Sequence, residues 1–262
     1  HLYIHAVEKV HPQRAVAAAD RLRDLVPGAG HLVHMPGHIY IRVGRYKEAV
    51  LANEKAIAAD DAYIAQCHAQ GLYPVAYIPH NHHFLAAAAS FIGDSGKALS
   101  ASRHMQAHQD QKLMRQPGYA TLQHYWAMPY FVLTRFGHWD EIMAEPKPAS
   151  DLIYPTGIWH YARGLAQVAL RVRQGERLSH ALIEAAVFPP LTTQLLKVGE
   201  ETGHLERMLE QLADIYEREV RTGIQRALTL GEPVIILVIA GFITVIILSI
   251  VLAVIETNNL AF

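Results

Sequence analysis

The chain has 262 residues, with 23 lysines and arginines against 24 aspartates and glutamates. This balance produces no strong positive field and argues against a nucleic-acid partner. The single cysteine, Cys67, excludes an internal disulfide and suits a reducing compartment, whereas seventeen histidines are a large number for this length. The chain opens on histidine rather than methionine, so we expect it to be a piece of a longer protein.

The first part of the chain, residues 1–171, carries an internal repeat of paired helices. A Gly-Arg-Tyr-Lys-Glu-Ala element begins at Gly44, and related elements begin at Gly93 and Gly137. Each element predicts a turn followed by the second helix of a pair, and neighbouring pairs are expected to stack because one pair cannot bury its own apolar face. The region resembles bacterial tetratricopeptide-repeat (TPR) proteins, in particular a histidine-rich subgroup from which no function can be transferred.

Histidines recur on the first helices of the predicted pairs. His31, His34 and His38 follow an i, i+3, i+7 spacing, which places them on one side of a helix. In proteins of the kind this region resembles, the first helices line a concave groove, so we expect the histidines to converge there. The predicted ligand-groove residues are His31, His34, His38, Tyr40, His80, His83 and His124.

Three interpretations of these histidines stay open. Concave repeat surfaces bind extended partners, which favours a groove for a peptide or protein ligand. A divalent metal is the second interpretation, because the i, i+4 pairs are suitably spaced for chelation. The candidate ligands are His1, His5, Glu8, His34 and His38. The third interpretation is purely structural: histidines cap helices and fill half-buried positions without any ligand. The sequence contains no His-Glu-x-x-His, cysteine-pair or Gly-x-Ser-x-Gly motif, so we expect neither catalysis nor an obligatory cofactor.

The second part of the chain is predicted to begin near residue 172, after a proline-broken loop over residues 144–151. A short helix is expected from Ser179, and Pro190 is well placed to open the next helix, over 191–198. We expect a tight turn at 199–203 and then an amphipathic helix over 205–230.

Several phrases in this part carry a second resemblance: Gly-Glu-Arg-Leu-Ser-His-Ala-Leu, Phe-Pro-Pro-Leu and Val-Gly-Glu-Glu-Thr-Gly-His-Leu. They resemble the C-terminal end of the inner-membrane platform protein of type II secretion and type IV pilus machines (the GspF/PilC family). The matching motif residues, with a structural role, are Gly199, Glu200, Glu201, Thr202, Gly203 and Pro233. The resemblance implies a non-catalytic scaffold that holds the assembly ATPase and related secretion proteins, with 172–231 as part of a cytoplasmic helical domain.

The last element is an apolar run over residues 233–255 that contains no charged residue and no histidine. As a helix it would span roughly 34 Å, enough for a bilayer core of about 30 Å. We therefore predict one transmembrane helix over 232–256 and a short extracytoplasmic tail over 257–262. Arginines precede the run and no basic residue follows it, which predicts that the N-terminal part is cytoplasmic.

Together these patterns predict an all-α, single-pass protein of the bacterial inner membrane, with a TPR-like array before a partial platform domain. The predicted function is a scaffold or adaptor in type II secretion or type IV pilus assembly. The alternative is a histidine-rich TPR protein that binds a metal or small ligand, the C-terminal part being a fusion or a joining artefact.

Overall fold

A computed structural model describes residues 1–67, 73–185 and 189–259, and all regular structure in these ranges is helical, as predicted. Within them, the side chains of residues 74, 76, 185, 230–232, 234, 235 and 251–259 are not described. The chain divides into two units, His1–Glu176 and Arg177–Phe262, and each is treated by itself below.

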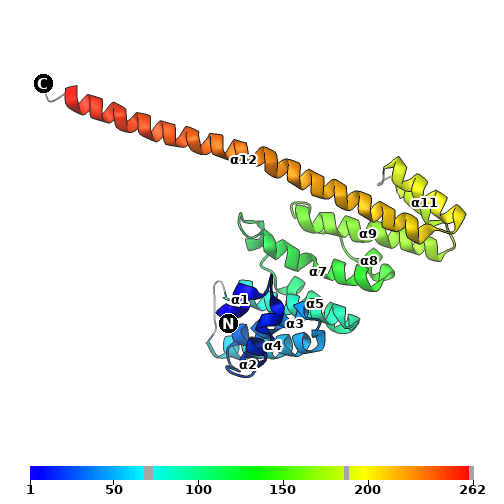
Figure 1. Ribbon diagram of the computed structural model, residues 1–262. Coiled ribbons are helices and arrows are strands. Elements are labelled where there is room, and N and C mark those ends of the chain that lie inside the picture. The colour runs from blue at the N-terminus through cyan, green and yellow to red at the C-terminus, as the bar shows by residue number, and fades with distance from the viewer. Residues whose placement is uncertain (68–72, 186–188, 260–262) are drawn as a thin grey trace. The chain divides into compact units, whose positions relative to one another are not determined.

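The N-terminal unit is a succession of helices in which consecutive helices lie side by side (Figure 1). Its elements are α1 (Leu2–Val7), η1 (Pro12–Ala15), α2 (Val16–Leu22), α3 (Gly30–Arg42), α4 (Tyr46–Cys67), η2 (Tyr73–Tyr77), α5 (Ile78–Phe91), α6 (Ser95–His108), η3 (Leu113–Arg115), α7 (Ala120–Phe136), α8 (Trp139–Ala144) and α9 (Ile153–Arg173).

The three predicted turns are confirmed at Gly44, Gly93 and Gly137, between α3 and α4, α5 and α6, and α7 and α8. Their φ angles of 81°, 79° and 69° lie in the left-handed region that favours glycine. The local turn chemistry therefore produces the helix pairs. That the pairs form a TPR array stays a prediction.

Small side chains allow the helices of this unit to pack closely. Ala86, Ala88 and Ala89 of α5 are at most 1% exposed and lie in the main apolar core. A second core forms where α9 meets α7 and α8, with Ala162 and Ala166 buried among larger apolar side chains. Because alanine has a high helix propensity and little bulk, the same residues favour the helices and their contact.

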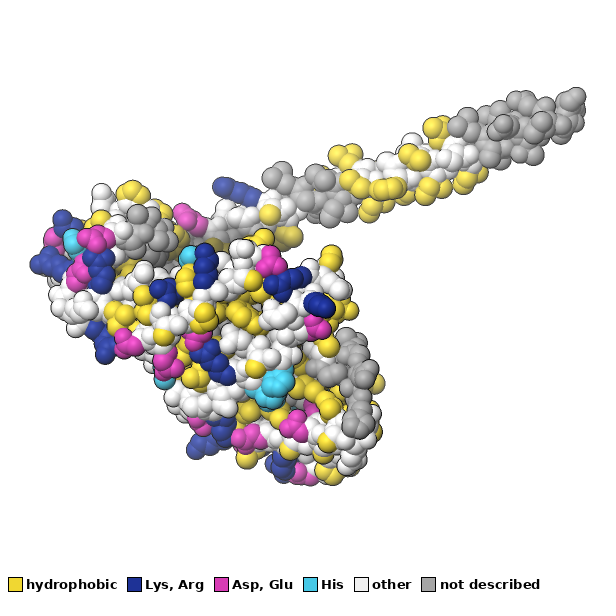
Figure 2. Space-filling view, turned by 180° about the vertical axis from the view of Figure 1, so that it is seen from behind, with side chains coloured by type: hydrophobic (Ala, Val, Ile, Leu, Met, Phe, Trp, Pro, Cys, Tyr) yellow, Lys and Arg dark blue, Asp and Glu magenta, His cyan; other side chains and the backbone are white. Residues whose placement is uncertain are grey.

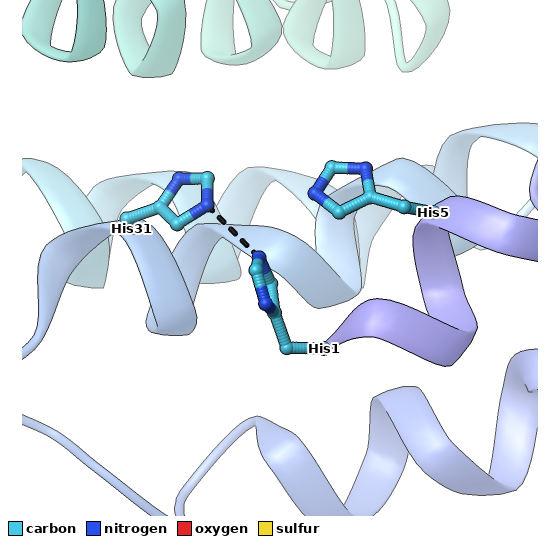
Figure 3. A group of neighbouring side chains, drawn as sticks. All are labelled: His1, His5 and His31. Carbon is cyan, nitrogen blue, oxygen red and sulfur yellow. Dashed lines mark hydrogen bonds between the residues drawn. The ribbon is translucent and has the colours of Figure 1, made fainter.

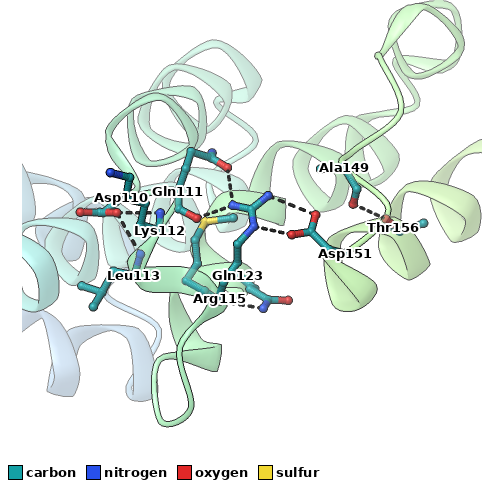
Figure 4. Close-up of polar contacts among 10 residues, drawn as sticks. Asp110, Gln111, Lys112, Leu113, Arg115, Gln123, Ala149, Asp151 and Thr156 are labelled. Carbon is teal, nitrogen blue, oxygen red and sulfur yellow. Dashed lines mark hydrogen bonds and ion pairs between the residues drawn. The ribbon is translucent and has the colours of Figure 1, made fainter.

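A charged contact joins the segment around η3 to the loop before α9. The Arg115 guanidinium donates to both carboxylate oxygens of Asp151, over 2.5 and 3.1 Å, and also to Gln111 (Figure 4). Asp110 accepts from the backbone N–H groups of Lys112 and Leu113. These bonds stabilise a connection that has little regular structure of its own.

The C-terminal unit contains α10 (Leu178–Ala185), α11 (Pro190–Thr202) and α12 (Leu205–Asn259). The expected turn over 199–203 is wrong: α11 continues to Thr202, and only Gly203 adopts a left-handed conformation, with φ of 71°. An expected end of the next helix near residue 230 is also wrong, because α12 runs through Pro233. A proline inside a helix removes one backbone hydrogen bond and crowds the preceding turn, so α12 continues through this position at a local energetic cost.

The predicted membrane-spanning helix over 232–256 is not confirmed, because the described part of the chain holds no helix with the length and apolarity that crossing a bilayer requires. The described side chains of α12 from Ile236 to Ile250 are nevertheless apolar with few exceptions and exposed (Figure 2). Of the predicted tail, residues 257–259 belong to α12, and 260–262 lie outside the described residues.

Candidate functional site

The site is built on α3, whose histidines lie on one side of the helix as their spacing predicts. A glycine at position 37 lets α4 approach this helix closely: a Cβ added there would lie 2.9 Å from Nδ2 of Asn53. Asn53 is fully buried and thereby reaches the ring of His34. The close contact of α3 with α4 thus places an amide beside the histidine row.

The first group of histidines comprises His1 and His5, at the start of the chain and in α1, and His31 in α3. Figure 3 shows the three rings converging on one space. Nε2 of His1 lies 3.1 Å from Nε2 of His31, and one ring nitrogen from each residue lies within 4.8 Å of the others. His1 and His5 are exposed, and His31 is half-buried.

The second group comprises His34 and His38 of α3 with His80 of α5, again with one nitrogen from each within 4.8 Å of the others. The ring centroid of His34 lies 4.8 Å from that of His38 and 4.7 Å from that of His80. Phe84 packs within 4.8 Å of all three ring centroids and covers them. His34 is fully buried, so this group is more enclosed than the first.

The electrostatics of the second group keep its imidazoles neutral. Burial lowers the pKa of His34 well below its usual value, and burial lowers the pKa of His80 to about 4. The pKa of His38 is also lowered by burial, against the opposing effect of the Glu8 carboxylate. Neutral imidazoles carry a free lone pair, which is the form that binds a metal or accepts a hydrogen bond from a ligand.

The remaining predicted groove residues lie farther along or elsewhere. His83 and His124 pair with centroids 5.4 Å apart, and His124 bonds to the hydroxyl of Tyr154. A cavity of about 280 Å³ connects His38 to His83. Tyr40 does not join them, because residues two positions apart on a helix, such as His38 and Tyr40, point to nearly opposite sides. The Tyr40 side chain is fully buried, and its hydroxyl donates to Asp20 at 2.8 Å.

Sequence reasoning missed the residues that support the histidines. Asn53 and Phe84 are ordinary core positions by pattern, and neither carries a local signal. It also missed a stack of His82, His104 and His108, with successive centroids 4.0 and 4.1 Å apart. The i, i+4 spacing of the last two on α6 was the available signal. His82 and His104 border a cavity of about 610 Å³, together with acidic residues and Lys97.

In the C-terminal unit, the predicted structural motif holds α10, α11 and α12 together. The carboxylate of Glu200 accepts from the backbone N–H groups of Leu178 and Ser179 at 2.6 and 3.2 Å, and also from the Ser179 hydroxyl. It therefore caps the first turn of α10, where a negative charge is favourable. Gly203 ends α11, and the backbone N–H of His204 returns to the carbonyl of Gly199.

Replacing Gly199 with alanine is expected to destabilise the α11–α12 hairpin by about 1–3 kcal/mol through overpacking. An added Cβ would lie 2.8 Å from Cγ of Met208 and 3.1 Å from the backbone Cα of Leu205. The measurement is hydrogen exchange of α11 amides in the full chain. Gly223→Ala is the matched control, since nothing lies within 4 Å of its added Cβ and alanine favours the helix by about 0.5–1 kcal/mol. Equal protection in both variants would contradict the close contact.

Comparison with known proteins finds a similarity in the C-terminal part: residues 160–253 match the family described as type II secretion system (T2SS), protein F. Among curated proteins, the type II secretion system protein F of Aeromonas hydrophila is 36% identical over 96 residues, which is 37% of this chain and 25% of that protein. The type IV pilus assembly protein PilC of Thermus thermophilus is 40% identical over 78 residues, 28% of this chain and 19% of that protein.

The type 4 fimbrial assembly protein PilC of Pseudomonas putida is 33% identical over 98 residues, 36% of this chain and 24% of that protein. The chain thus spans about a quarter of the length of these relatives or less. No solved structure matches this chain. The expected resemblance to the GspF/PilC family is therefore supported by sequence similarity. The matching segment begins inside α9, twelve residues before the expected position near 172.

Proposed function

We propose that this chain is a non-catalytic adaptor of a type II secretion or type IV pilus assembly machine, anchored in the bacterial inner membrane by α12. The observation that carries the proposal is the match of residues 160–253 to protein F of the type II secretion system. The proposed partners are the assembly ATPase of such a machine, other secretion or pilus proteins, and the lipid bilayer.

The anchor is supported by the side chains of α12. Exposed isoleucine, leucine, valine and phenylalanine between positions 236 and 250 have no described protein surface to cover them. An exposed apolar surface of this size is unfavourable in water and favourable in hydrocarbon. The arginines that precede the segment favour an N-terminal part on the cytoplasmic side.

The packing of α9 supports a single functional chain rather than a joining artefact. The family match begins at His160, within α9, and continues through Ala162 and Ala166, which are at most 1% exposed. These residues complete the core formed with α7 and α8, and Arg163 donates to the carbonyl of Met143 at 2.6 Å. If the two parts had been joined by error, no single transcript would span the codons from Arg163 to Leu191. Sequencing of transcripts tests this alternative.

The test of the anchor is membrane fractionation of the full chain in a bacterium that carries a type II secretion system. The wild-type chain should stay in the membrane pellet after an alkaline carbonate wash. The double variant Ile243→Asp/Ile247→Asp should shift to the supernatant, because each aspartate near the centre of a span costs about 2.5–3.5 kcal/mol. Ile224→Asp is the matched control, an exposed isoleucine of the same helix before the apolar run, and should remain in the pellet. A wild-type chain in the supernatant would refute the anchor.

The adaptor role is tested on the same membranes. Affinity purification of the wild-type chain in mild detergent should retain the assembly ATPase above the level obtained with an unrelated single-pass protein. A chain that stays in the membrane and retains no secretion protein would refute the adaptor role while leaving the anchor intact.

A second candidate function is favoured by the convergence of His31, His34, His38 and His80 on one face of the N-terminal unit. This face would bind a peptide, a protein segment or a small ligand through imidazole groups. It is compatible with an adaptor, which needs a second binding surface in addition to its membrane segment.

A further inference from the structure

The hydrogen bonds around the second histidine group determine which ring nitrogens carry protons. The amide nitrogen of Asn53 donates to the carbonyl of Ala49 at 2.7 Å, so its Oδ1 faces Nδ1 of His34, also at 2.7 Å. An amide oxygen only accepts, so Nδ1 of His34 carries the proton. Oε2 of Glu8 lies 2.6 Å from Nδ1 of His38, and the carboxylate makes that nitrogen a donor in the same way.

It follows that Nε2 of His34 and Nε2 of His38 both present lone pairs. Both atoms are buried, and neither has a hydrogen-bond partner within the described ranges of the chain. Burying an acceptor without a partner is unfavourable. The two rings that carry these acceptors lie beside His80, since one ring nitrogen from each of the three residues lies within 4.8 Å of the others. A bound cation would satisfy all three nitrogens at once.

We propose that His34, His38 and His80 bind one divalent transition-metal ion, with zinc as the reference ion, through three imidazole nitrogens. Three histidine ligands with an open fourth position are a recurring zinc arrangement, with Zn–N distances of about 2.0–2.1 Å. One ring nitrogen from each residue already lies within 4.8 Å of the others, so binding an ion requires the three rings to approach one another further.

The surroundings match what such a site requires. Metal-bound histidines usually donate their other ring N–H to a carboxylate or carbonyl oxygen, which orients the ring and raises its basicity. Asn53 and Glu8 supply these acceptors for His34 and His38. The ring of Phe84 packs against the imidazoles and adds an apolar side to the site, which lowers the local polarity around a bound ion. The ligands come from α3 and α5, so the ion would cross-link two helix pairs.

The group of His1, His5 and His31 is the nearest competing site, and it lacks this support. Among the described residues, the carboxylate or amide contact of its rings is that of His5 with Glu8, at 3.6 Å, and two of its three residues are exposed. We therefore place the ion in the enclosed group. Variants of the exposed group test whether the ion binds there instead.

The experiment uses the full chain in detergent, stripped with a chelator and titrated with zinc alone. The wild-type chain should bind one ion tightly enough to keep it through desalting. Cobalt should give the visible absorption of a four-coordinate ion. His80→Gln should weaken binding by at least about 100-fold, and Glu8→Gln by about 10- to 100-fold. His104→Gln, at a half-buried histidine of α6 outside both groups, should change it less than about 3-fold.

Two controls make the result decisive. Circular dichroism should show unchanged helix content in every variant, and Glu8→Gln leaves all three ligands in place if His80→Gln folds poorly. The proposal is overturned if the wild-type chain loses zinc on desalting, or if His104→Gln weakens binding as much as His80→Gln. It is also overturned if the ion persists in His80→Gln and disappears in the triple variant His1→Ala/His5→Ala/His31→Ala.

Discussion

Replacing Asp60 with alanine is expected to lower the free energy of unfolding of the N-terminal unit by about 3–5 kcal/mol, through the loss of two hydrogen bonds to a buried carboxylate. Asp60 is 1% exposed and accepts from Tyr73 at 2.6 Å and from Asn81 at 2.7 Å. It therefore joins α4 to η2 and α5. In the variant, the buried Asn81 amide loses the acceptor that satisfies it, which makes the loss larger than that of an exposed polar contact.

The measurement is urea unfolding of the full chain in mild detergent, followed by tryptophan fluorescence. Asp61→Ala is the matched control, since Asp61 is the next residue in α4 and is exposed, and it should change the free energy by less than about 0.5 kcal/mol. Gly30 supports the same argument: a Cβ added there would lie 1.8 Å from Oδ1 of Asp60, so Gly30→Ala should also destabilise strongly. Asp60→Ala and Asp61→Ala with equal effects would show that the network does not stabilise the fold.

The metal-free chain is expected to lose stability steeply between pH 6.5 and pH 4. Burial lowers the pKa of His80, His82 and His83 to about 4 in the folded chain, whereas an exposed histidine has a pKa near 6.5. As the pH falls below 6.5, the unfolded chain therefore binds protons before the folded chain does. The free energy of unfolding falls through this window, by up to about 3 kcal/mol for each ring, and becomes level below pH 4.

Urea midpoints at pH 7.5, 6.5, 5.5 and 4.5 measure this effect. His83→Gln should make the dependence shallower by the contribution of one ring, because glutamine does not titrate. Added zinc should raise stability at pH 7.5 and lose that benefit at pH 4.5, where protons compete for the same imidazole nitrogens. A midpoint that stays constant from pH 7.5 to pH 5.5 in the wild-type chain would contradict the burial of neutral rings.

Local sequence signals predicted the helical architecture because its determinants are close in the chain. The turns at Gly44, Gly93 and Gly137 depend on a left-handed conformation that glycine adopts at low cost. The same reasoning failed at 199–203, where two glycines suggested a turn throughout. Only Gly203 turns, because Gly199 is required for close contact with Met208 rather than for a special backbone angle.

For the candidate site, sequence spacing predicted that three histidines share one face of a helix and that they converge in a groove with His80, His83 and His124. It placed His31, His34 and His38 together, and it wrongly grouped Tyr40 with them. The i, i+4 pairs did not show that His31 joins His1 and His5 whereas His80 joins His34 and His38, and nothing in the sequence indicated that Phe84 packs against the second group. The proposed metal ligands and the residues that orient them are far apart in the chain: Glu8 and His80 are separated by 72 positions. Their proximity depends on packing.

The sequence by itself determined an all-helical chain, the glycine turns between its helix pairs, and the similarity of residues 160–253 to protein F of the type II secretion system, since propensity, turn chemistry and short motifs are local properties. The tertiary structure alone decided which histidines meet, which ring nitrogens carry lone pairs, and that family-matching residues of α9 complete the core of the N-terminal unit. These outcomes depend on how apolar faces pack against one another, and packing is set by contacts between residues far apart in the chain.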